Sequence, residues 1–358
     1  MAHDLPAPTT LPPNGTWPRQ ADIARVAGVS QATVSMVIND PSASRFSISA
    51  PTRERVWTAV EQLSYTTNSA ARVLAGGRSR TLGVFTFEPA FPTTSPDFYL
   101  PFLQGIEEES ERQDHDLLLF TSGSGSDRTR SIYRNGANRL RSADGCIMLG
   151  LGGDDTELER LAREPLPVVY IGRRVIPDAD VAYIGADYAG ATARVVSLLM
   201  DAGHRRIAYL GRTQDDVPTR DRYRGYLTAH EEEGRRPDPG ALHLRDDADP
   251  AEILRAILDS RASAVIVQDG AAATAVATAA QAAGLHVPRD LSIAVLGDPS
   301  SADERDWTGF EIPRTQMGEQ AVRMLVSMLD ARGGPLPQRL LECSIHPGST
   351  IGPAPSES

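Results

Sequence analysis

Residues 21–39 read ADIARVAGVSQATVSMVIN, and this stretch decides the fold of the first part of the chain. Apolar side chains recur at helical spacing on both sides of a Gly28-Val29 pair, at Ile23, Ala24 and Ala27 and again at Val34, Val37 and Ile38. Glycine permits a tight turn, and Ser30 is a favourable N-cap for a second helix. The pattern predicts two short helices, over residues 20–27 and 31–38, that cross closely at the turn.

Around this pair the sequence predicts a small helical head and a connecting helix. Residues 52–63 place Val56, Val60 and Leu63 on one face, which predicts a third helix and a head over residues 19–66. Residues 68–75 form a further short helical segment inside a linker of residues 67–80. Residues 1–18 are rich in proline and threonine and are predicted to be a disordered lead-in.

From Thr81 onward, short apolar runs alternate with helical stretches. The predicted strands are residues 82–87, 117–121, 145–149, 168–171, 181–184, 207–210, 264–267 and 292–296. The predicted helices among them are residues 102–113, 190–202, 221–232, 250–258, 271–283 and 316–329. This alternation is typical of a parallel, doubly wound α/β sheet, and its length indicates two such units.

Composition bounds the class of protein. The 358 residues, 41% of them hydrophobic, are enough for two or three domains. The whole chain carries −11, but residues 1–80 hold eight arginines against five acidic residues, so the head carries +3 and the remainder −14. A basic head suits contact with phosphates. The sequence has no apolar run of membrane-spanning length, no signal peptide and no metal-ligand spacing around Cys146 and Cys343. We therefore expect a cytoplasmic protein without a metal or cofactor.

Several segments resemble the lactose-repressor/galactose-repressor (LacI/GalR) family, and the resemblance covers almost the whole chain. Besides residues 21–39, they are residues 49–56, 63–65, 97–99, 105–107, 185–190, 203–208 and 222–226. The resemblance implies a helix-turn-helix head, a hinge helix, and a periplasmic-binding-protein-like body of two doubly wound α/β subdomains. The body would span residues 81–348, with an N-subdomain at 81–184 and 312–336 and a C-subdomain at 185–311 and 337–348. A loose tail would follow at 349–358.

The resemblance implies a transcriptional regulator, commonly a repressor, and not an enzyme. It implies binding as a homodimer to a near-palindromic operator in double-stranded DNA, with the second helix in the major groove. By this resemblance Gln31, Ala32 and Met36 face base edges. Gln31 suits adenine and Ala32 suits the methyl group of thymine. Met36 stands where the family usually has arginine, so we expect a different base preference there. The positions that would contact phosphate are Ser30, Thr33, Ser35 and Asn39; for Thr33 and Ser35 the alternative is a solvated helix face.

Residues 68–75 resemble the hinge helix of the family. The implied DNA contacts are Asn68, Ala71, Arg72 and Leu74. An eight-residue helix is marginal in water, so we expect it to fold when two copies pack together on the operator. Leu74 matches a leucine that wedges into the minor groove, where unstacking a base step costs about a few kcal/mol. A contact between protomers is the alternative role for Leu74.

The resemblance also implies a small-molecule effector, a sugar or related metabolite, bound between the subdomains at the carboxyl ends of strands. Arg222 is the leading candidate for contacting it. Phe98 and Tyr99 would stack on an apolar sugar face or, alternatively, pack at a helix start. The other implied effector contacts are Gln268, Asp269 and Asp298. The sequence departs from the family at Gly297, where an aspartate is usual.

Other readings of the sequence stay open or are disfavoured. The same regulator could be controlled by a protein partner instead of a small ligand. An exported solute-binding protein would need a signal peptide and no helix-turn-helix head. A doubly wound enzyme is disfavoured because the chain has no lysine for a phosphate loop, no Gly-x-Gly-x-x-Gly after the first strand and no Gly-x-Ser-x-Gly. His204 is predicted to cap a helix end, and Glu107–Glu109 to lie on a solvated helix face.

Overall fold

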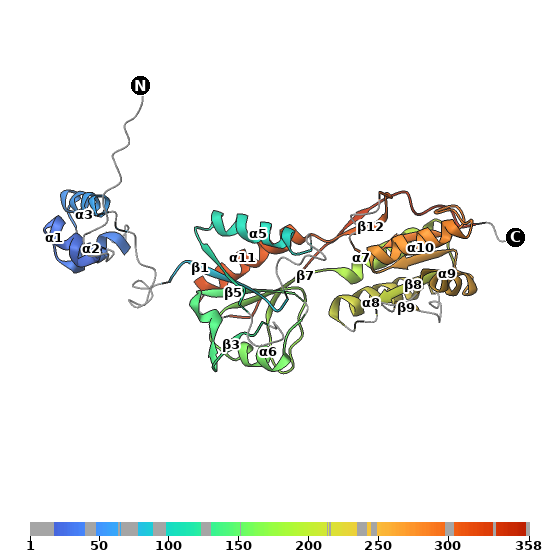
Figure 1. Ribbon diagram of the computed structural model, residues 1–358, viewed down its shortest axis with the longest axis horizontal. Helices are drawn as coiled ribbons and strands as arrows, with labels where there is room; N and C mark the ends of the chain where they lie inside the picture. Colours follow the sequence, from blue (N-terminus) through green and yellow to red (C-terminus); the bar gives the residue numbers. More distant parts are fainter. Residues whose placement is uncertain are drawn as a thin grey trace, which may run out of the picture. The chain divides into compact units, whose positions relative to one another are not determined.

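The computed structural model describes residues 18–39, 48–63, 65, 78–88, 98–122, 130–150, 152–212, 214, 216–234, 242–244, 249–297, 304–331 and 334–355. The chain divides into two compact units, Met1–Ser79 and Arg80–Ser358, which we call the head and the body (Figure 1). The head is helical and the body is built on parallel sheets, which confirms the predicted fold class. The predicted lead-in lies almost wholly outside the described residues.

The head contains three helices, α1 (Gln20–Ala27), α2 (Gln31–Asn39) and α3 (Ala50–Gln62). α1 ends at Gly28, whose φ of 65° is a left-handed conformation that glycine adopts without strain. α2 begins where the hydroxyl of Ser30 accepts the N–H of Thr33 at 3.1 Å. The buried core of the head comes from all three helices: Ile23, Ala24, Ala27, Val34, Val37, Val56 and Ala59.

The first lobe of the body is a six-stranded, all-parallel sheet with the order β13-β7-β6-β5-β1-β2. Its strands are β1 (Thr81–Thr86), β2 (Asp116–Phe120), β5 (Gly145–Leu149), β6 (Val168–Ile171), β7 (Ala182–Ala186) and β13 (Gln338–Leu341). Its helices are α5 (Leu100–Arg112) and α11 (Arg314–Asp330) on one face and α6 (Asp155–Ala162) on the other. A small hairpin of β3 (Tyr133–Arg134) and β4 (Ala137–Asn138), followed by η1 (Arg139–Ser142), precedes β5.

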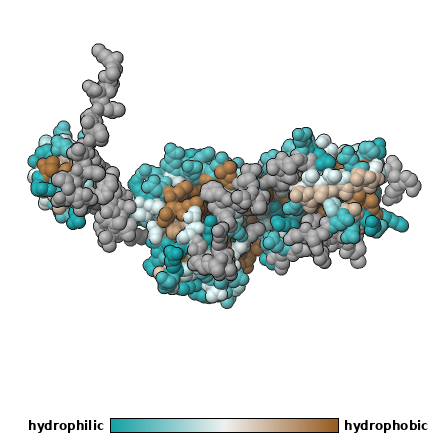
Figure 2. Space-filling model, viewed as in Figure 1, coloured by the Kyte–Doolittle hydropathy of each residue, from teal (hydrophilic) through white to brown (hydrophobic). Residues whose placement is uncertain are grey.

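The second lobe repeats this plan with the strand order β14-β12-β11-β10-β8-β9, in which β14 alone is antiparallel. Its strands are β8 (Ile207–Arg212), β9 (Leu242–Leu244), β10 (Ala264–Val267), β11 (Ser292–Val295), β12 (Thr308–Glu311) and β14 (Ser344–His346). Its helices are α7 (Tyr188–Asp201), α8 (Val217–Glu232), α9 (Pro250–Asp259) and α10 (Gly270–Ala282). The exposed side of the alanine-rich α10 forms a pale, weakly apolar band in Figure 2.

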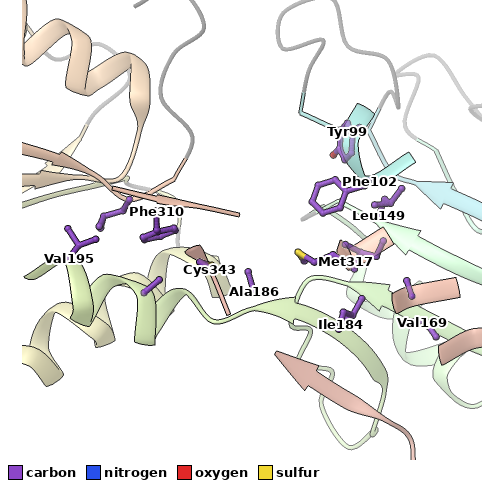
Figure 3. Close-up of a cluster of buried hydrophobic side chains, with 14 of the residues drawn as sticks. Tyr99, Phe102, Leu149, Val169, Ile184, Ala186, Val195, Phe310, Met317 and Cys343 are labelled. Atoms are coloured by element: carbon purple, nitrogen blue, oxygen red, sulfur yellow. The ribbon is translucent and has the colours of Figure 1, made fainter. Parts of the chain in front are cut away.

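The chain passes between the lobes three times, after β7, after β12 and after β13. Figure 3 shows Ala186, the last residue of β7, and Cys343, which follows β13, between apolar groups of the two lobes. The last passage differs from the predicted boundary. β13 pairs with β7 in the first sheet, so residues 338–341 lie in the first lobe and not in the C-subdomain. β13, with the sequence QRLL, is mostly exposed because it is an edge strand, and it has no long apolar run that would reveal a strand in the sequence.

The prediction of a loose tail is wrong for residues 349–355, which pack on the second lobe. Thr350 is buried; its carbonyl accepts the N–H of Ile293 at 3.0 Å and its hydroxyl accepts the N–H of Thr308 at 2.9 Å. The backbone N–H of His204 caps α7 at Leu199, as predicted. The His204 ring, whose pKa burial lowers, also donates to the carbonyl of Gly352 at 3.0 Å and so holds the tail in place.

Glu109 corrects the prediction of a wholly solvated acidic face on α5. Its side chain is buried against α11, where Arg323 donates to both carboxylate oxygens at 2.9 and 2.8 Å. Arg112 and Gln113 donate to it as well. The hydrogen bonds from Arg323 are the main reason that the pKa of Glu109 falls to about 2. Glu109 therefore fastens α5 to α11 as a carboxylate.

Candidate functional site

The second helix of the head presents polar and small side chains outward from a fixed core. Gln31, Ala32 and Met36 are exposed, whereas Val34 and Val37 on the opposite side are buried. Met36 is a large apolar residue that is 39% exposed on this helix. The predicted base-facing residues therefore share one accessible side of α2.

The predicted phosphate contacts lie beside this surface, but some of their groups are already engaged. The hydroxyls of Ser30 and Thr33 lie 2.8 Å apart and share a hydrogen bond, so one donor remains for an outside acceptor. Thr33 and Ser35 are half-buried, which places them at the edge of the exposed side. The side chain of Asn39 and the hinge residues Asn68, Ala71, Arg72 and Leu74 lie outside the described residues.

Arg222 occupies the carboxyl edge of the second sheet. It comes from α8 and is only 7% exposed. Its Nε donates to the carbonyl of Leu296 at 2.8 Å, immediately after β11, and its guanidinium carbon lies 3.9 Å from the centre of the Tyr188 ring. The ring of Phe310 lies 5.8 Å away on the same guanidinium. Two aromatic faces and a carbonyl thus fix the direction of a buried cation.

Gln268 and Asp269 follow β10 at the same edge, and both side chains form hydrogen bonds with other residues of this lobe. Gln268 donates to the hydroxyl of Thr219 at 2.8 Å and accepts the N–H of Arg212 at 3.2 Å. Asp269 caps α10 by accepting the N–H of Ala272 at 3.0 Å. Thr219 belongs to α8, the helix that also carries Arg222, so Gln268 is hydrogen-bonded to that helix. Asp298 lies outside the described residues.

Phe98 and Tyr99 precede α5 in the first lobe. The Tyr99 hydroxyl donates to Glu88, whose other oxygen accepts the N–H of Gly152 at 3.0 Å. Burial raises the pKa of Tyr99 far above its usual value, and the bond to Glu88 raises it further, so the phenol stays a donor. The exposed Phe98 ring lies 5.2 Å from the guanidinium carbon of Arg314.

Four further residues of this region could not be singled out from the sequence. Glu88 follows β1, Arg173 follows β6, Asp221 precedes Arg222, and Arg314 begins α11 after the second passage between lobes. Glu88, Arg173 and Arg314 lie at or just after the end of a strand or helix, and Asp221 lies inside α8, so none of the four belongs to a short motif that could have marked it. Among the described residues, no group of three or more potential metal ligands is found, and no helix is long and apolar enough to cross a membrane.

Two family models match this chain, one in the head and one in the body. Residues 21–68 match the family described as "Bacterial regulatory proteins, lacI family", and residues 196–351 match the "Periplasmic binding protein-like domain". The chain belongs to the LacI family. This LacI-family protein is a DNA-binding transcriptional regulator, as the sequence predicted.

Curated relatives of this LacI-family regulator are regulators as well. It is 29% identical over 314 residues to the HTH-type transcriptional regulator CelR of Thermobifida fusca, which covers 86% of this chain and 90% of CelR. It is 28% identical over 324 residues to catabolite control protein A of Priestia megaterium, covering 86% and 92%. These relatives are transcriptional regulators and not enzymes.

Solved structures agree in fold. A structure of a transcriptional regulator CelR–cellobiose complex matches with a TM-score of 0.62 and 25% identity, covering 93% of this LacI-family chain and 99% of that one. The lac repressor dimer bound to operator and an anti-inducer matches with a TM-score of 0.70, covering 94% and 100%. At 21% identity, the second match shows the shared fold alone.

Proposed function

We propose that this regulator is a cytoplasmic repressor that binds a near-palindromic operator as a homodimer and is switched by a small molecule. One helix-turn-helix head reads only a few base pairs. Two heads bound about one helical turn apart read enough base pairs to select a specific site. The accessible side of α2, with Gln31, Ala32 and Met36, supports reading in the major groove.

The contacts with DNA are divided between reading and positioning. Gln31 would hold adenine through its amide, and Ala32 and Met36 would pack on apolar base edges. Ser30, Thr33, Ser35 and Asn39 would contact phosphate and set the register. Asn68, Ala71, Arg72 and Leu74 of the hinge would reach the operator centre, with Leu74 in the minor groove.

The observation that carries the effector proposal is Arg222. A guanidinium that is 7% exposed and directed by two aromatic rings toward the carboxyl edge of the sheet is a feature of binding sites. Phe98, Tyr99, Gln268, Asp269 and Asp298 would complete the contacts from both lobes. CelR forms a complex with cellobiose, and this supports a sugar or related metabolite as the effector of the present chain.

The switch would operate through the lobes. Effector binding favours one arrangement of the two lobes, and the paired bodies then favour or disfavour packing of the two hinge helices on DNA. A coupling free energy of about 1–3 kcal/mol would change operator affinity by roughly 5- to 150-fold. Repression relieved by effector is the direction we propose.

Genomic footprinting of the purified protein tests this function and identifies operators. Fluorescence anisotropy on an identified operator, with and without metabolites made by the neighbouring genes, then tests the switch. A ligand that raises the melting temperature and releases DNA supports the proposal. Specific DNA binding that responds only to a protein partner would support the alternative control. Absence of specific DNA binding would refute the function.

A further inference from the structure

A cavity of about 450 Å³ lies in the first lobe, at the edge of the sheet opposite the proposed effector contacts. Its walls are the end of α6, the starts of β6 and β7, the end of α11 and the segment that leads to β13. The strands therefore present their amino ends to it, whereas Glu88 and Arg173 follow carboxyl ends of the same sheet. A cavity of this volume is large enough for a small drug-sized molecule.

The lining of this cavity is mostly apolar. Its large aliphatic side chains come from both helices, both strands and the connecting segments: Leu161, Leu166, Val168, Val181, Met328 and Leu336. Leu336 is 41% exposed, so it forms part of the open side of the cavity. Moving an apolar ring from water into such surroundings is favourable by roughly 25 cal/mol for each Å² buried. The lining therefore favours a molecule whose larger part is apolar.

Tyr170 of β6 belongs to the lining and is only 4% exposed. Its hydroxyl has no hydrogen-bond partner among the residues that the structure describes. Burial raises the pKa of this phenol to about 12, so the hydroxyl keeps its proton at neutral pH. An unpaired buried hydroxyl costs about 1–3 kcal/mol, and such a group in a folded protein requires an explanation. Packing of the chain by itself does not account for a tyrosine at this wall.

The charged side chains of the lining are acidic. Glu164 accepts hydrogen bonds from the amide of Asn138 at 2.8 Å and from the hydroxyl of Tyr133 at 2.9 Å. The bond from Asn138 is the main reason that the pKa of Glu164 is lowered, so Glu164 stays a carboxylate. Asp180 is exposed, and its carboxylate forms no hydrogen bond or ion pair with any described residue. Since no described lining residue is basic, the cavity favours a cation over an anion.

We infer that this cavity is a second ligand site, for a small molecule that has an apolar ring system and a positively charged amine. The ring occupies the space among the aliphatic side chains, and the amine lies beside the free carboxylate of Asp180. A carboxylate or phosphate in the same place is repelled by Asp180 and Glu164. The site shares no lining residue with the effector contacts proposed around Arg222, so it does not rest on them.

Three probes with the same ring and different charge test the inference on the full-length protein. Naphthylmethylamine is a cation at pH 7, naphthylmethanol is neutral and naphthoic acid is an anion. Calorimetry and saturation-transfer NMR measure their binding at constant ionic strength. We expect the amine to bind about three- to fivefold more tightly than the alcohol, since one exposed ion pair contributes up to about 1 kcal/mol. The acid should bind more weakly than either.

Exposed residues provide matched variants that assign the binding to this cavity. Leu336→Ala should weaken all three probes by about threefold or more, because part of the apolar wall is lost. Leu340→Ala is its control, since Leu340 is 40% exposed on β13 and lies outside the lining. Asp180→Asn should remove the preference for the amine over the alcohol. Asp178→Asn, at an exposed position of the same loop outside the lining, should keep this preference.

Several outcomes would overturn the inference. Absence of saturable binding by the probes would do so, as would an acid that binds as tightly as the amine. Equal effects of Leu336→Ala and Leu340→Ala would place the probes elsewhere. Probe affinity that falls as the protein concentration rises would show that a second copy of the chain fills the cavity instead.

One further variant separates this site from the proposed effector site. Arg222→Met should bind the amine probe as the wild type does, because Arg222 is not part of the cavity. Loss of probe binding in Arg222→Met would place the probe at the effector contacts and overturn the inference. The proposed function would still stand in that case, because operator binding and its response to effector are measured independently.

Discussion

Arg173 and Asp221 join the two lobes through a two-pronged ion pair. Nε of Arg173 lies 3.0 Å from Oδ2 of Asp221, and its Nη2 lies 2.5 Å from Oδ1. Arg173 follows β6 of the first lobe, and Asp221 belongs to α8 of the second, next to Arg222. Arg174 also donates to the carbonyl of Gly152, whose N–H is bound by Glu88. The ligand-side ends of both lobes are therefore connected.

Removing the Arg173–Asp221 ion pair between the lobes should change the affinity for effector. In Arg173→Met we expect effector affinity to change by about five- to 30-fold, since a partly exposed ion pair contributes roughly 1–2 kcal/mol. Arg224→Met is the control, because Arg224 pairs with the same carboxylate at 3.2 Å from within α8. Calorimetric titration measures both. Equal effects of the two variants would show that Asp221 needs neutralisation only, and not a bridge between lobes.

If α2 reads bases in the major groove, substitutions on its exposed side should weaken binding to some operator sequences more than to others. Gln31→Ala should weaken binding to the operator by about 1–3 kcal/mol and relax the preference at one base pair. Met36→Arg should shift the preference toward guanine at its position. Anisotropy on operators with single base changes reports both. Gln62→Ala, at an exposed position near the end of α3, is the comparison that should leave the base preference unchanged. A uniform loss across all sequences in Gln31→Ala would indicate a phosphate contact instead.

The hinge prediction concerns Leu74. Leu74→Ala should reduce operator affinity by about tenfold or more, because the wedge that offsets unstacking is lost. The same variant should bind effector as the wild type does. A circularly permuted operator fragment reports DNA bending, which should decrease together with affinity. Unchanged bending with weaker dimerisation in sedimentation would favour the alternative role as a contact between protomers.

Glu109 makes the first lobe sensitive to acid. Its pKa of about 2 lies below the value of 4.5 for an unfolded glutamate, so its contribution is fully present above about pH 4.5 and is lost as the pH falls toward 2. Glu109→Gln should lower the free energy of unfolding at pH 7 by about 1–3 kcal/mol, because Arg323 and Arg112 are partly exposed and solvent screens the pairs. Denaturant titration at pH 7 and pH 3 measures the difference.

Glu108→Gln is the matched control on the same helix. Glu108 is 58% exposed and pairs only with Arg112 among its described ion pairs, at 3.2 Å. We expect a change within about 0.5 kcal/mol for this surface pair. A loss as large as that of Glu109→Gln would contradict the role of the α5–α11 contact. So would a Glu109→Gln effect that is the same at pH 3 as at pH 7.

Local sequence determined the head and the plan of the body. Neighbouring residues set the boundary between α1 and α2. Gly28 ends α1 in a left-handed conformation, and Ser30 caps the start of α2. The buried strands were visible because both of their faces are covered, which makes them continuous apolar runs. The motifs also marked Arg222. All of these signals lie within a few residues of one another.

The tertiary structure determined the features that depend on contacts between residues far apart in the sequence. Edge strand β13 has no apolar run to reveal it, and only pairing with β7 places it in the first lobe. The tail after residue 348 reads as loose until Thr350 bonds to Ile293 and Thr308. Arg173 and Asp221 are 48 positions apart, and Glu109 and Arg323 are 214 apart. Burial and counter-charges of such residues come from segments that folding brings together, so no local pattern contains them.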